Sequence, residues 1–185
     1  MRLTLVLGGA RSGKSTFAKK LMEGHGGPVT FFATARARDE EMKRRISLHK
    51  KERPSAWNTW EGNPRDLIGH LNTVNGAVLV DCLTTWLSEL MFDRCDVDSL
   101  SEDDWDEVQR DLLSYVEMLC KTKGPEFLVV VSNEIGSGVV PASSMGRRFR
   151  DLQGRANQIA ALHADDVVMI IAGLPLWLKG GISLS

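Results

Sequence analysis

The sequence predicts an α/β fold in which helices flank a mostly parallel sheet. Short apolar runs alternate along the chain with helix-length amphipathic stretches, which is the pattern of strand and helix units in α/β proteins. Several of these runs are apolar at every position, as expected for parallel strands that are covered on both faces. The expected strands are 2–7, 29–33, 77–80, 127–132 and 167–171.

Apolar spacing and capping residues predict the helices between these strands. The first helix is expected to begin at Gly13 or Lys14, and the second to run from Asp39 to about Lys51 with acidic residues in its first turn. Asn63, followed by a proline, is expected to open a short helix. Further apolar stripes predict helices over 83–90, over 105–119 after a start that resembles a capping box, and over 145–159.

Length and composition exclude several classes of protein. The 185 residues, 43% of them hydrophobic and 25% charged, predict a single domain, 1–185, with a sizeable core. We expect no membrane span, because the longest apolar runs are far shorter than about 20 residues, and no secretory leader, so the expected location is the cytoplasm. The three cysteines favour neither a disulfide framework nor a zinc site. The net charge of −1 argues against nucleic acid as a partner.

A phosphate-binding motif follows the first expected strand directly. It consists of Gly8, Gly9, Ala10, Arg11, Ser12, Gly13, Lys14 and Ser15, a full match to G-x-x-x-x-G-K-[ST] between a strand and a helix. Glycines let consecutive backbone N–H groups surround an anion, and the helix N-terminus adds a partial positive charge. The lysine ammonium would reach the β- and γ-phosphates. The predicted fold is therefore an α/β P-loop fold of the RecA-like kind.

A nucleotide bound with Mg²⁺ requires oxygen ligands for the metal. Ser15 supplies a hydroxyl, and Asp81 follows an apolar strand from which a carboxylate would reach the metal or its waters. The alternative interpretation of Asp81 is that it caps the helix that begins near Cys82. The two roles are compatible.

His49 lies in a basic segment and continues an apolar stripe of the second expected helix. A histidine in that position is either an ordinary core residue or a nucleophile. Its cationic neighbours favour a neutral, nucleophilic ring and attract a triphosphate. Residues 36–53 carry eight Lys or Arg against four acids, whereas 93–107 carry eight acids against one arginine and are expected to form a solvated surface.

A polar pair, Asn133 and Glu134, ends the strand expected at 127–132, and a glycine-containing loop follows. These residues either position a substrate or nucleotide, or belong to a turn that uses Gly136 and Gly138.

Taken together, these motifs resemble the family of bifunctional adenosylcobinamide kinase / adenosylcobinamide-phosphate guanylyltransferases, over nearly the whole chain. The ordered series is more specific than the phosphate loop alone. It comprises GGARSGKS at 8–15, Ala33-Thr34, a series from Asp39 to Pro54 that includes His49, then Trp57, Glu61, DCLTT at 81–85, NExGxGxVP at 133–141, RFRDxxGxxNQ at 148–158, and Gly173-x-Pro175.

The resemblance implies two uses of nucleotide in cobalamin biosynthesis. ATP or GTP phosphorylates adenosylcobinamide, and GTP then donates GMP to adenosylcobinamide phosphate through a guanylyl-histidine, which releases pyrophosphate. The family's nucleophile falls on His49, and Lys14 is the second expected catalytic residue. The resemblance also implies a homotrimer. Its guanine-nucleotide contacts fall on 8–15, on Thr34, Ala35 and Arg36, on Lys50, Lys51, Glu52 and Arg53, on Glu61 and on Asp81.

Two other functions remain compatible with the residues themselves. One is a P-loop kinase that acts on another small alcohol or nucleotide, with His49 structural. The other is a nucleotide-dependent switch or assembly protein without small-molecule chemistry.

Overall fold

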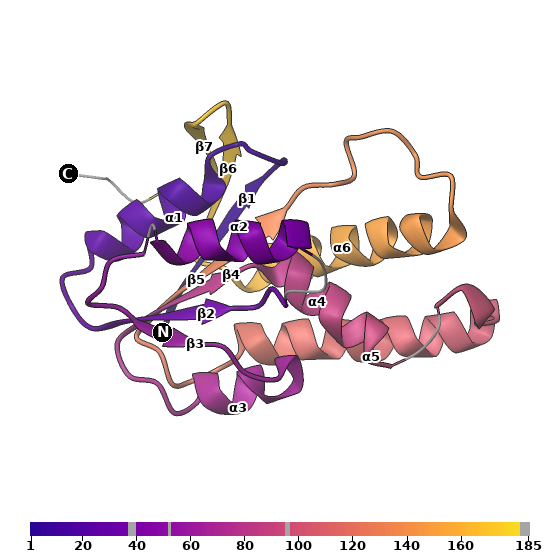
Figure 1. The fold of residues 1–185 in the computed structure, drawn as a ribbon, viewed down its shortest axis with the longest axis horizontal. Helices are drawn as coiled ribbons and strands as arrows, with labels where there is room; N and C mark the ends of the chain where they lie inside the picture. Colours follow the sequence, from indigo (N-terminus) through magenta and orange to yellow (C-terminus); the bar gives the residue numbers. More distant parts are fainter. Residues whose placement is uncertain (37–39, 52, 95–96, 182–185) are drawn as a thin grey trace.

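The computed structural model describes residues 1–36, 40–51, 53–94 and 97–181 (Figure 1), without the side chains of Met42, Arg45, Leu48, His49, Lys51 and Asp98. One sheet runs through the molecule in the order β3-β2-β4-β5-β1-β6-β7. Neighbouring strands are parallel except β6 and β7, which are antiparallel. The strands are β1 (Arg2–Gly8), β2 (Val29–Ala33), β3 (Asn58–Trp60), β4 (Ala77–Asp81), β5 (Phe127–Asn133), β6 (Asp166–Ile171) and β7 (Leu174–Lys179).

The predicted fold class, a P-loop fold with a mostly parallel sheet, is confirmed, and so are the five expected strands. Two further strands, β3 and β7, form the edges of the sheet. β7 contains Pro175, which an edge strand tolerates because its free side needs no N–H donor.

The helices are α1 (Lys14–Glu23), α2 (Glu40–Lys51), α3 (Leu67–Leu71), α4 (Leu83–Phe92), α5 (Glu102–Cys120) and α6 (Ser144–His163). Capping residues explain several of their boundaries. Ser101 accepts the N–H of Asp104 at the start of α5, as the sequence predicted. Asn63 accepts the N–H of Arg65 but opens a short 3₁₀ turn, Pro64–Asp66, so α3 begins only at Leu67. The expected start of the second helix, Asp39, lies outside the described residues.

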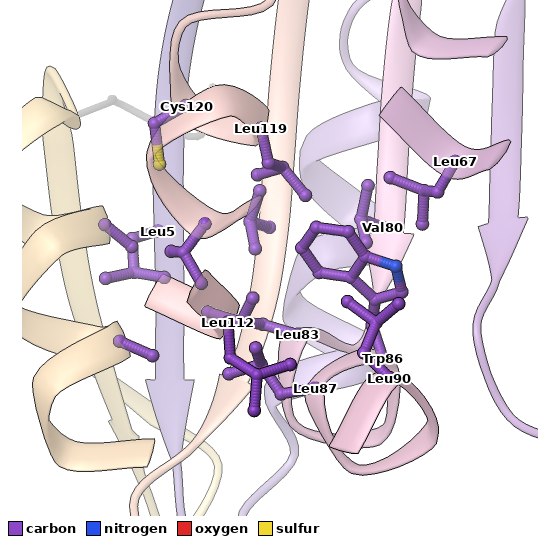
Figure 2. Close-up of a cluster of buried hydrophobic side chains, with 14 of the residues drawn as sticks. Leu5, Leu67, Val80, Leu83, Trp86, Leu87, Leu90, Leu112, Leu119 and Cys120 are labelled. Carbon is purple, nitrogen blue, oxygen red and sulfur yellow. The ribbon is translucent and has the colours of Figure 1, made fainter. Parts of the chain in front are cut away.

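Apolar side chains cover both faces of the sheet. In β1, Leu3, Leu5 and Leu7 belong to a core cluster with α3, α4, α5 and α6, whereas Val6 faces a second cluster with α1. This alternation is what a strand buried on both sides requires. Trp86 lies in the first cluster (Figure 2). Its indole N–H donates to the carbonyl of Pro64 at 2.7 Å. Each such large side chain stabilises the fold by about 1.5–3 kcal/mol through burial.

Among the described helices, none has the length and apolar character needed to cross a bilayer.

Candidate functional site

The phosphate loop joins the carboxyl end of β1 to the N-terminus of α1. Gly13 is the N-cap of α1 and has φ +95°, a left-handed conformation that glycine adopts without strain. A Cβ on Gly13 would also come within 3.3 Å of the Cα of Gly173. The Lys14 ammonium donates to the carbonyl of Gly9 at 3.1 Å. The loop therefore folds around its own lysine, with the first N–H groups of α1 unpaired within the helix.

The tip of the β6–β7 hairpin supports this loop. The N–H of Gly173 donates to the carbonyl of Ser12 at 2.9 Å. Ala172 and Gly173 both have positive φ, as a two-residue type I′ turn requires. The hydroxyl of Ser12 is buried with no hydrogen-bond partner among the described residues. An unpaired buried hydroxyl at a phosphate loop is suited to an oxygen-rich ligand, because leaving it unpaired costs free energy.

A cleft of about 710 Å³ opens above the phosphate loop, which is a size typical of small-molecule sites. It brings together predicted residues from four parts of the chain. Those that line it are Ala10, Arg11, Ser12, Gly13, Lys14, Ser15, Ala35, Arg53 and Asp81. Further lining residues are Thr16, Phe31, Ala33, Ile46, Cys82, Thr85 and Asn133.

The ends of β2 and β4 are tied together beneath the cleft. The hydroxyl of Thr34 donates to the carbonyl of Cys82 at 2.8 Å and accepts its N–H at 2.7 Å. Thr34 is buried and does not itself line the cleft. Cys82, not Asp81, caps α4, with Thr85 completing a capping box. The interpretation of Asp81 as the helix cap is therefore wrong, because the chain enters α4 one residue later.

Arg53 is a buried cation at the wall of the cleft. Its side chain is 9% exposed, and its guanidinium lies 3.9 Å from the centre of the Phe31 ring. Burial lowers the pKa of Arg53, against the opposing charge of Glu61 and then of Asp81. Its Nε is buried without a partner among the described residues. A cation held in this way has an unsatisfied donor for an anionic ligand.

Glu61 joins two of the predicted cations. Its carboxylate accepts from the Lys50 ammonium at 2.8 Å and lies 3.5 Å from an Arg53 nitrogen. The three residues also line a second cleft of about 500 Å³ with Pro54, Ser55, Trp57 and Thr59. Because Arg53 lines both clefts, the two cavities adjoin at its side chain.

The remaining predicted residues occupy other positions. The guanidinium of Arg36 lies 3.4 Å from the carboxylate of Asp93 and 3.9 Å from that of Glu89, so it pairs with the end of α4. Gly8 and Gly9 precede the part of the loop that lines the cleft. His49 lies in α2, three residues after Ile46, which does line it. The side chains of His49 and Lys51 and the whole of Glu52 lie outside the described residues.

Comparison with known proteins adds an independent observation. The family model described as cobinamide kinase / cobinamide phosphate guanyltransferase matches residues 4–178. The chain belongs to this family. The resemblance drawn from the motifs is therefore confirmed. The chain is accordingly an enzyme of the kinase and guanylyltransferase class, rather than a non-catalytic nucleotide switch.

Three relatives cover almost all of the chain. A protein of Pseudomonas aeruginosa, named bifunctional adenosylcobalamin biosynthesis protein CobP, is 40% identical over 95% of the chain and 96% of its own length. Proteins of Escherichia coli and Salmonella typhimurium, each named bifunctional adenosylcobalamin biosynthesis protein CobU, are 35% and 34% identical over 96% of the chain and 99% of their own lengths.

Sequence reasoning missed several residues that line the cleft. Phe31 was expected only as part of a buried strand, yet its ring faces the Arg53 guanidinium. Thr85 was noted only within a shared motif. Asn133 was not missed: the sequence left open that it positions a substrate or nucleotide, and the structure places it in the lining of the cleft, at the carboxyl end of a parallel strand.

Proposed function

We propose that residues 1–185 form one nucleotide-binding domain that catalyses two successive steps at one phosphate loop. In the first, ATP or GTP phosphorylates adenosylcobinamide. In the second, GMP passes from GTP to adenosylcobinamide phosphate through a guanylyl-histidine on His49, giving adenosylcobinamide-GDP and pyrophosphate. The observation that carries the proposal is the single cleft that Lys14, Ser15, Asp81 and Arg53 line together, in a chain of this family.

The kinase step depends mainly on positioning and on neutralising phosphate charge. Lys14 and the N-terminus of α1 would hold the β- and γ-phosphates, and Arg53, which lines the same cleft, would add a second cation for the triphosphate. Ser15 and Asp81 fit Mg²⁺, because a hydroxyl and a carboxylate are hard oxygen donors and the ion usually completes its shell with water and phosphate oxygens. Bound there, Mg²⁺ would supply further charge neutralisation.

The guanylyl step forms and breaks one bond to phosphorus in each half. An imidazole nitrogen of His49 attacks the α-phosphorus of GTP, and the bond from that phosphorus to the bridging oxygen breaks to release pyrophosphate. A phosphate oxygen of adenosylcobinamide phosphate then attacks the same phosphorus, and the bond to nitrogen breaks, which restores the histidine. Two steps let a small nucleophile react before the bulky acceptor must approach. The position of His49 in α2, three residues beyond Ile46, supports this role.

The test of this proposal is labelling with α-³²P GTP and Mg²⁺. The wild-type chain should acquire an acid-labile, base-stable label, and His49→Ala should acquire none while still phosphorylating adenosylcobinamide. His70→Ala is the matched control, because His70 packs edge-on against Trp60 away from the cleft. Loss of phosphorylation in His49→Ala to the same extent would contradict the division of labour. Absence of any turnover with adenosylcobinamide and GTP would contradict the function.

We further propose that the enzyme is a homotrimer that acts in the cytoplasm, where nucleoside triphosphates are supplied. Support for association comes from an exposed apolar strip on the edge strand β7, where Leu174, Leu176 and Leu178 are 70%, 53% and 59% exposed. Exposed apolar patches of this kind mark interaction surfaces. Leu176→Asp should lower the molar mass measured by light scattering, whereas Met118→Asp, on α5, should leave it unchanged.

A further inference from the structure

The strand between the phosphate loop and the acidic end of β4 ends in Asn133, a polar residue for which the sequence left two roles open, positioning of a ligand or part of a turn. β5 lies between β4 and β1 (Figure 1), and Asn133 is paired in register with Gly8, the last residue before the phosphate loop. Asp81, at the end of β4, is paired with Val131 of the same strand. Asn133 therefore lies between the phosphate loop and the acidic strand end, and it lines the same cleft as both.

The main chain of Asn133 is held from three sides. Its N–H donates to the hydroxyl of Thr84 in α4 at 2.9 Å, and its carbonyl accepts from the amide of Asn157 in α6 at 3.1 Å. The next N–H, that of Glu134, donates to the carbonyl of Gly8 at 3.1 Å. These bonds fix the end of β5 to two helices and to the phosphate loop.

A buried polar cluster fixes the direction of the Asn157 amide. Its oxygen accepts from Ser132 at 2.6 Å and from the Gln153 amide at 2.9 Å, which leaves its NH₂ group for the carbonyl of Asn133. Ser132 and Gln153 are completely buried, and Asn157 is nearly so. Polar groups in such a place are costly unless they are paired, and among the described residues every side-chain polar atom of this cluster is paired except the Oε1 of Gln153. The paired atoms hold the Asn157 amide in one orientation.

The side-chain amide of Asn133 itself makes no hydrogen bond to any described residue, and it is not fully buried. An amide offers two donors and an acceptor without carrying charge, so it suits a phosphoryl oxygen beside a cationic phosphate loop. Resting on the proposed function, we propose that Asn133 contacts the γ-phosphoryl group during the kinase step, and that Thr84 and Asn157 are positioning residues that hold it there.

The kinase rate with ATP and adenosylcobinamide tests this role directly. Asn133→Ala should lower kcat about 100-fold, the usual effect of removing one preorganised donor, while the KM for ATP changes less than about threefold. Labelling of the enzyme by α-³²P GTP should change far less, because that step displaces pyrophosphate at the α-phosphorus. Asn133→Asp is nearly isosteric and should also lower the kinase kcat, because aspartate lacks the two amide donors and adds a negative charge. This variant tests the proposal if Asn133→Ala fails to fold.

The positioning residues have a matched control. Thr84→Val should lower kcat, whereas Thr84→Ser keeps the hydroxyl and should retain the wild-type kcat. The control is Thr122→Val, which removes a comparable hydroxyl that is bonded to Asn72 far from the cleft and should leave kcat unchanged. Wild-type kinase rates in both Asn133 variants would overturn the proposal. A wild-type chain with no kinase activity on adenosylcobinamide would instead overturn the proposed function, so the two failures are distinguishable.

Discussion

Replacing Arg53 by methionine should separate the stability of the protein from its affinity for nucleotide. The guanidinium is almost buried, stacked on Phe31, and only 3.5 Å from one carboxylate oxygen of Glu61. Arg53→Met removes the charge but keeps an apolar stem of similar length against the ring. The substitution therefore tests whether this cation is there for the fold or for a ligand.

Without nucleotide, the opposing contributions nearly cancel. Stacking on an aromatic ring contributes about 0.5–2 kcal/mol, and an ion pair with a partly exposed carboxylate adds about 0–1 kcal/mol. Both are offset by burial of the charge, which is also the cause of the lowered pKa of Arg53. The free energy of unfolding of Arg53→Met should therefore lie within about 1 kcal/mol of the wild-type value.

With GTP bound, we expect the balance to change, because the buried Nε of Arg53 would gain a partner. A hydrogen bond to a charged group contributes about 1.5–3 kcal/mol. Losing this bond in Arg53→Met should therefore raise the dissociation constant for GTP roughly 10- to 150-fold. Urea unfolding without nucleotide measures the stability, and isothermal titration with GTP measures the affinity. Arg65→Met is the control, since Arg65 is exposed and donates to the Asp93 carbonyl; it should change neither quantity.

The opposite pattern would refute this reasoning. An Arg53→Met variant that loses more than about 2 kcal/mol of stability and binds GTP as tightly as the wild type would make Arg53 a structural cation.

Three further predictions concern the phosphate loop, pH and thiol chemistry. Lys14→Met should lower kcat/KM about 100-fold in both the kinase and guanylyl assays, because each step neutralises a triphosphate. A hydrogen bond from Arg2 lowers the pKa of Asp166, whose side chain is 2% exposed. The ionised carboxylate therefore stabilises the fold fully above the usual carboxyl pKa of about 4, and this stabilisation is lost as the pH falls through the lowered pKa of the folded state. The midpoint of urea unfolding should fall over that pH range, and Asp166→Asn should make the midpoint less dependent on pH. Burial raises the pKa of Cys120 to about 12, so a Cys95→Ser variant, left with two buried thiols, should resist iodoacetamide at pH 8 when monitored by mass spectrometry.

The parts of the fold that were predictable are those in which local pattern and burial agree. The five central strands are apolar runs buried on both faces, and each was found in its expected place. β3 is three residues long and largely exposed, and β7 places leucines at the surface beside a proline. Neither edge strand has the apolar alternation that a half-buried strand would show, so pattern alone could not reveal them.

The candidate site likewise contains parts that a local sequence pattern predicts and parts that depend on contacts between distant segments. The phosphate loop was predictable because eight consecutive residues carry its geometry and chemistry. The contact between Arg53 and Glu61 depends on how the chain passes β3. The sequence placed Arg53 only in a basic segment suited to a triphosphate, and Glu61 was expected only through the family resemblance. The three-sided support of Asn133 joins α4, β5 and α6 across sequence separations of 24 and 49 residues, and no local pattern encodes such contacts.

The hairpin beneath the phosphate loop links two surfaces that lie apart. At its tip, the N–H of Gly173 donates a hydrogen bond to the carbonyl of Ser12. Its second strand, β7, carries the exposed leucines of the proposed subunit contact. A nucleotide and a neighbouring copy would thus both act on the same pair of strands. Binding events that stabilise one element favour each other reciprocally, so dilution of the enzyme should weaken its hold on GTP, and GTP should in turn promote assembly.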